Sequence, residues 1–185
     1  DAAHMVAIVE PADSAIAWNQ RAIAFAEASP DSTGKHWLGS LYNNIGWSLH
    51  DQGDYAQALE VIQRAWEWRK ARPGGQETLI AKWCAARALR SLGRLDEALA
   101  MQRELQSEWA SRPEKSDGYV DEELGECLLA LGRAGEAKPA FARAYVALSK
   151  DRWLAEHEEA RLRRLAELGG VTPTARRSSG MRECD

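Results

Sequence analysis

The chain has 185 residues, of which 45% are hydrophobic and 28% charged, a composition typical of a soluble globular protein. Its formal net charge of −4 argues against nucleic acid and anionic membranes as partners, and no apolar run approaches the length that spans a bilayer. The three cysteines, Cys84, Cys127 and Cys184, are too widely spaced for a disulfide framework or a zinc site. We therefore expect a reducing compartment, the cytoplasm.

The first part of the chain predicts a partial helical repeat over residues 1–34. Residues 1–10 are expected to be the end of one helix, and residues 12–28 a second helix with apolar residues along one side. The cluster of turn-forming residues at 29–34 ends this unit.

A helical hairpin over residues 39–72 follows and is the most regular part of the sequence. A tight turn is predicted at residues 51–54, which contain Gly53. Apolar residues recur at helical spacing on both sides of this turn: Leu41, Ile45 and Leu49, then Ala58, Ile62 and Ala65. Because neither helix can bury its stripe alone, the hairpin needs neighbours of its own kind.

Two more helix pairs are predicted at residues 79–112 and 118–150, with turns at Gly93 and Gly132. Small residues are expected where the helices approach closely: Gly46, Ala58, Ala86, Ala98, Gly125 and Ala137. Pro139 is expected to bend the second helix of the last pair.

A final helix over residues 151–168, with Asp151 as its N-cap, is expected to cap the last pair. Its apolar side would consist of Trp153, Leu154, Leu162 and Leu165. The polar residues 169–185 are expected to form a flexible tail.

The three turn glycines, Gly53, Gly93 and Gly132, stand 40 and 39 residues apart. This regularity, and the segment Gly53-Asp54-Tyr55 followed by Ala58, resembles the tetratricopeptide repeat. The period is longer than the usual one, so the resemblance is to the extended variety of that family. It implies an all-α, right-handed superhelical stack of antiparallel helix pairs over residues 1–168, with a C-terminal capping helix. An irregular helical bundle would not account for glycines in register.

The family resemblance also implies a concave groove lined by the first helix of each pair. Counting from the turn glycines, the residues expected to face it are Asn43, Asn44, Trp47 and His50, then Trp83, Cys84, Arg87 and Arg90, then Tyr119, Glu122, Glu123 and Glu126. Trp47 and Trp83 are either aromatic anchors for a partner or packing between neighbouring first helices. The arginines and glutamates either pair with one another or present a basic and an acidic end to a peptide.

No catalytic or metal-binding constellation is evident. His157 lies among acidic residues but lacks a second histidine at the spacing of a zinc-binding helix, and Cys84 has no histidine nearby in the sequence. We therefore expect neither a cofactor nor enzymatic activity.

The sequence predicts a scaffold that binds a peptide or a protein segment in the concave groove, with neither nucleic acid nor membrane as a partner. The alternative is a structural module that forms a homo-oligomer, in which the groove or the end of the array packs on a second copy.

Overall fold

A computed structural model describes residues 12–30, 35–72, 75–112 and 118–173. Within these ranges all regular secondary structure is helical. The chain divides into two units, residues 1–115 and residues 116–185. The helix end expected at residues 1–10 and most of the expected tail, residues 174–185, lie outside the described ranges.

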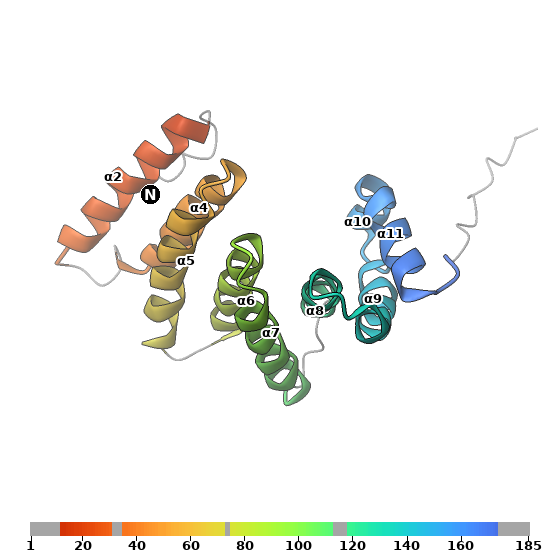
Figure 1. Ribbon diagram of the computed structural model, residues 1–185. Coiled ribbons are helices and arrows are strands. Elements are labelled where there is room, and N and C mark those ends of the chain that lie inside the picture. The colour runs from red at the N-terminus through yellow and green to blue at the C-terminus, as the bar shows by residue number, and fades with distance from the viewer. Residues whose placement is uncertain (1–11, 31–34, 73–74, 113–117, 174–185) are drawn as a thin grey trace, which may run out of the picture. The chain divides into compact units, whose positions relative to one another are not determined.

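The first unit is a succession of helices that each pack on the next along the chain (Figure 1). Its helices are α2 (Ala12–Ala28), α4 (Leu38–Asp51), α5 (Tyr55–Lys70), α6 (Gln76–Ser91) and α7 (Leu95–Ala110). The pairs α4–α5 and α6–α7 are the antiparallel hairpins predicted from the sequence.

The second unit contains the last helix pair and its cap. Its helices are α8 (Tyr119–Ala130), α9 (Ala134–Leu148), α10 (Arg152–His157) and α11 (Glu159–Gly169). The helix α9 continues through Pro139, which is exposed. None of the helices that the structure describes is long and apolar enough to cross a membrane.

The three inter-helix turns share one backbone geometry, which explains the spacing of the glycines. Gly53, Gly93 and Gly132 have φ angles of 83°, 76° and 75°, a left-handed region that glycine enters without a steric penalty. In each turn the residue after the glycine donates its N–H to a carbonyl five residues earlier, at 3.0, 2.9 and 2.8 Å. This is the Schellman arrangement that ends a helix.

The next helix then starts at once. Asp54 accepts a hydrogen bond from the Gln57 N–H at 3.2 Å, whereas Arg94 and Arg133 hold Glu97 and Glu136 through paired hydrogen bonds of 2.6 to 2.8 Å.

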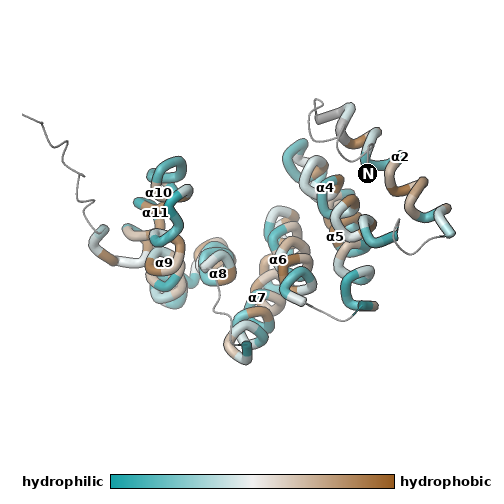
Figure 2. Tube along the Cα trace, turned by 180° about the vertical axis from the view of Figure 1, so that it is seen from behind, coloured by the Kyte–Doolittle hydropathy of each residue, from teal (hydrophilic) through white to brown (hydrophobic). Residues whose placement is uncertain are grey.

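The small residues predicted at helix contacts are buried. A Cβ atom built on Gly125 would lie 2.7 Å from the Phe141 ring, and one on Gly46 would overlap Ile62. The alanines at the other predicted contacts, Ala58, Ala86, Ala98 and Ala137, are at most 1% exposed. Hydrophobic and hydrophilic positions alternate along the helices of each unit (Figure 2), as a helix with one buried side requires.

The capping element differs from the single helix predicted over residues 151–168. Asp151 does cap α10, accepting from the N–H groups of Trp153 and Leu154 at 2.8 and 3.1 Å. The chain then leaves helical geometry at Glu158, with φ −123° and ψ 35°, and α11 begins. Trp153 was expected to cover the last pair, but it is 58% exposed and stacks on His157.

The helix α11 packs against α9 and buries Leu162, Leu165 and Ala166. Gly169 was expected in the tail, but it is the last residue of α11 and is buried. A Cβ atom built there would lie 2.6 Å from the backbone nitrogen of Ala142.

Candidate functional site

The predicted groove residues of α4 and α6 meet within the first unit. The ring centroids of Trp47 and Trp83 are 6.1 Å apart, with the rings tilted by 41°. The Cζ atom of Arg87 lies 5.5 Å from the centroid of Trp47 and 5.6 Å from that of Trp83. Both distances are within the range of cation–π attraction. We call these three residues the tryptophan–arginine cluster.

The cluster is only partly buried, because all three side chains retain intermediate exposure. The two rings pack on each other between the first helices α4 and α6, and each keeps some exposed surface. Tryptophan and arginine are among the residue types most enriched where binding energy is concentrated.

His50 extends the cluster along α4. Its ring centroid is 5.0 Å from those of Trp47 and Tyr55, and its Nε2 atom is 2.8 Å from the Ser91 hydroxyl. Burial lowers the pKa of His50, and the positive charge of Arg87 lowers it further. The imidazole is therefore neutral at pH 7, and its hydrogen bond with Ser91 joins α4 to α6.

Sequence reasoning missed Tyr55 and Ser91. The signal available for Ser91 was its position directly after Arg90, in the last turn of a first helix.

Cys84 lies under the cluster as a packing residue. Burial raises the pKa of its thiol to about 11, although a hydrogen bond with Trp47 and the charge of Arg87 act in the opposite direction. A thiol with this pKa carries almost no thiolate at neutral pH, so Cys84 is not an activated nucleophile.

Asn43, Asn44 and Arg90 have intermediate exposure on the same two helices. Within the described part of the chain, the side-chain amides of Asn43 and Asn44 make no hydrogen bond. Arg90 adds to the positive charge around His50. This face therefore presents amide and guanidinium donors beside two aromatic rings.

The acidic residues of α8 are held by α11 inside the second unit. Arg161 donates to both carboxylate oxygens of Glu122, at 2.8 and 2.5 Å, and its Cζ lies 5.3 Å from the centroid of Tyr119. Arg164 pairs with Glu126. Glu122 and Glu123 are 8% and 2% exposed.

Glu122 and Glu126, two of the carboxylates expected to face a ligand, are thus paired with arginines that stand three residues apart on α11. The pairing considered from the sequence, between these glutamates and Arg87 and Arg90, did not include those arginines.

No group of three histidine, cysteine or acidic residues with metal-binding geometry occurs among the described residues. The arrangement on α4 and α6 offers donors, apolar area and a neutral imidazole, which suit recognition of a polypeptide.

Comparison with known proteins identifies the repeats. Models of the tetratricopeptide repeat match residues 38–71 and residues 79–104, which correspond to the hairpins α4–α5 and α6–α7. No curated protein matches the chain.

Among solved structures, the fold is similar to that of the Rap conjugation gene regulator of the plasmid pLS20, determined in complex with a Phr peptide. The TM-score is 0.61 at 18% sequence identity, and the similarity covers 84% of this chain and 47% of the regulator. The chain thus spans about half the length of that regulator, and the likeness concerns the fold alone. Together with the repeated turns and helix contacts, the two matches show that residues 38–71 and 79–104 are tetratricopeptide repeats.

Proposed function

We propose that this protein is a non-catalytic scaffold that binds an extended peptide or protein segment along the first helices α4 and α6. The observation that carries the proposal is the tryptophan–arginine cluster, in which Arg87 lies over the partly exposed rings of Trp47 and Trp83. A segment lying across these rings would cover apolar area and receive hydrogen bonds from Arg87 and the neighbouring amides.

The charge of this face indicates the chemistry of the partner. Arg87 and Arg90 lie on α6, while Glu122 and Glu126 are paired with arginines of α11. We therefore propose a ligand with an acidic residue close to an aromatic or large aliphatic one. We do not propose a basic residue in the ligand, because Glu122 and Glu126, which would have attracted it, are paired within the chain. The net charge of the chain speaks against nucleic acid or anionic membrane as the partner, and the wide spacing of the cysteines supports a cytoplasmic location.

The fold of the pLS20 regulator supports the proposal, because that protein was solved with a bound peptide. Tetratricopeptide repeats also place their first helices side by side, so a ligand can contact several repeats at once.

The test begins with selection of binding peptides from a phage-displayed library on the intact chain, followed by titration of a labelled hit. Trp83→Ala should weaken binding by ~2 kcal/mol, roughly 30-fold, if the ring is an anchor. Arg87→Glu should weaken it further, and binding should also weaken as salt rises.

Trp153→Ala is the matched control, because it removes an exposed tryptophan from α10. Equal affinity of Trp83→Ala, Arg87→Glu and the wild type, all folded by circular dichroism, would exclude the α4–α6 face as the site.

A second candidate function is self-association. Phe25 on α2 is 73% exposed and Val146 on α9 is 50% exposed, and apolar side chains in such positions favour contact with another copy. Light scattering over a range of concentrations tests this: a constant monomer mass would rule it out, whereas a mass that returns to the monomer value in Phe25→Ser would support it.

A further inference from the structure

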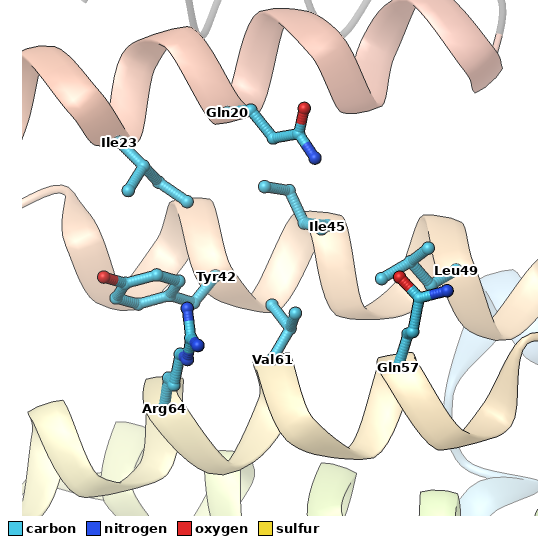
Figure 3. A pocket seen from close by; sticks show the side chains of 8 residues that line it. All are labelled: Gln20, Ile23, Tyr42, Ile45, Leu49, Gln57, Val61 and Arg64. Carbon is cyan, nitrogen blue, oxygen red and sulfur yellow. The ribbon is translucent and has the colours of Figure 1, made fainter.

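A cavity outside the α4–α6 face lies among α2, α4 and α5 in the first unit (Figure 3). Its volume is about 200 Å³. Its apolar lining consists of Ile23, Ile45, Leu49 and Val61, and its polar lining of Gln20, Tyr42, Gln57 and Arg64. Arg64 and Tyr42 lie next to each other at one end, and Leu49 and Gln57 lie at the other (Figure 3). Because the side-chain amide of Gln57 donates to the Asp54 carboxylate, Arg64 is the main group at the cavity available to a charged ligand.

The internal repeats show that Arg64 occupies a position normally used for an ion pair. In the next pair of helices, Lys82 and Glu104 hold the equivalent positions, with Nζ and Oε2 2.8 Å apart. In the last pair, Asp121 and Arg143 hold them, also at 2.8 Å. The equivalent residues of the α4–α5 pair are Tyr42 and Arg64, which cannot form an ion pair.

Arg64 consequently lacks a carboxylate partner within the described ranges. The Tyr42 hydroxyl instead donates to Glu27 of α2 at 2.6 Å. Burial and this interaction raise the pKa of Tyr42 to about 12, so the phenol stays protonated and is no anionic partner for Arg64. Glu27 is the acidic group next to the phenol, and it would repel a bound anion.

We propose that this cavity binds a small apolar carboxylate: a branched aliphatic or aryl group against Ile23, Ile45 and Val61, with its carboxylate on Arg64. The cavity supplies the two features that such a ligand needs, an apolar floor and one cation at its end. Its volume is below the ~300–1,000 Å³ of pockets for drug-sized ligands, which limits the occupant to about the size of one large side chain. The same chemistry is found in a free small acid and in the last residue of a peptide chain.

Isocaproate and N-acetyl-leucine are suitable probes, because both join a branched aliphatic group to a carboxylate. Their neutral amides, isocaproamide and N-acetyl-leucinamide, keep the shape and remove the charge. Titration of the full chain, followed by amide chemical shifts, should give saturable changes that centre on residues 20–27, 42–49 and 57–64. N-acetyl-leucine binding more tightly than isocaproate would indicate a peptide end, and the reverse order a free acid.

Variants then test the role of each group. Arg64→Gln should raise the dissociation constant about fivefold, the size expected for one partly exposed ion pair. Glu27→Gln should lower it about twofold by removing the repelling charge while keeping an acceptor for Tyr42. Val61→Trp should abolish binding by filling the cavity. Arg143→Gln is the matched control, since it removes the equivalent arginine of the last helix pair and should change nothing.

Binding of an acid with this variant pattern and without binding of its amide supports the proposal. Three results would overturn it: no saturable shifts with either acid, equal binding of acid and amide, or an Arg64→Gln dissociation constant equal to that of the wild type. Thermal melts of every variant keep loss of binding separate from loss of fold, and Arg64 and Glu27 are exposed enough to be replaced without unfolding.

Discussion

Replacing Gln102 by methionine should stabilise the protein. Gln102 is on α7, is 0% exposed, and neither its Oε1 nor its Nε2 atom has a hydrogen-bond partner among the described groups. The residues at the equivalent positions of the other two pairs are Ile62 and Phe141, which are 0% and 1% exposed. The register thus places an amide where the fold buries apolar side chains.

The size of the effect follows from the cost of that amide. A buried polar group without a partner costs about 1–3 kcal/mol. Methionine has nearly the same length and no group to desolvate, so Gln102→Met should raise the free energy of unfolding by about 1–3 kcal/mol. For a chain of this size each kcal/mol shifts the melting temperature by roughly 2–4 °C.

Differential scanning calorimetry and urea titration of wild type and variant measure this change. Gln106→Met, four residues further along α7 at a half-buried position, is the control and should stay within about 0.5 kcal/mol. A melting temperature of Gln102→Met that is equal to or lower than that of the control would refute the reasoning, because the amide would then be satisfied in the folded protein.

Three other changes test the cap, the cluster and the end of the domain. Gly169→Ala should lower the free energy of unfolding by about 1–3 kcal/mol, because the new Cβ would meet the backbone of Ala142. Gly135→Ala should raise it by up to about 1 kcal/mol, because a Cβ there has nothing within 4 Å. Thermal melts that rank the two variants otherwise would contradict the packing of α11 on α9. Because the pKa of His50 is lower in the folded chain than its unfolded value of about 6.5, the unfolded chain binds the proton more readily, and stability should fall as pH drops below about 6.5. Urea titrations at several pH values should show a smaller fall in His50→Gln, and equal falls would be contrary to this view. Truncation before Asp151 should cause aggregation by uncovering α9, whereas truncation after Val171, whose N–H still caps α11 at 2.9 Å, should not; light scattering separates these outcomes.

The helix pairs could be predicted because their signals are local. A glycine that must adopt a positive φ, and an alanine or glycine that must fit under a neighbouring helix, are each fixed by a few residues around them. The positions of all three inter-helix turns follow from such signals, and the end of α2 follows from the turn-forming cluster at 29–34. The break at Glu158 could not be predicted this way, since neither glycine nor proline marks it.

The charge pairs of the candidate site could not be predicted from the sequence. Arg161 and Glu122 are 39 residues apart, and their meeting depends on how α11 packs against α9. From the sequence alone, Glu122 and Glu126 had several possible cationic partners, and Arg90 was nearer in the chain to each of them than the arginine that pairs with it. The orientation of Trp153 was missed for the same reason, because the break at Glu158 turns α10 independently of α11.

The same register of the first helices carries different chemistry in the two units. Trp83 and Glu122 each stand three residues before the small contact residue, Ala86 or Gly125, while Arg87 and Glu126 each stand one after it. In the first unit these positions bring aromatic rings and a guanidinium group together across α4 and α6. In the second they hold the arginines of the capping helix. The backbone contacts of the repeat therefore fix where a first helix presents side chains. The residue types at these positions then determine what the helix contacts: a neighbouring first helix in the first unit and the capping helix in the second. The α8 positions are occupied by that cap, whereas on α4 and α6 the corresponding side chains pack on one another and keep partial exposure.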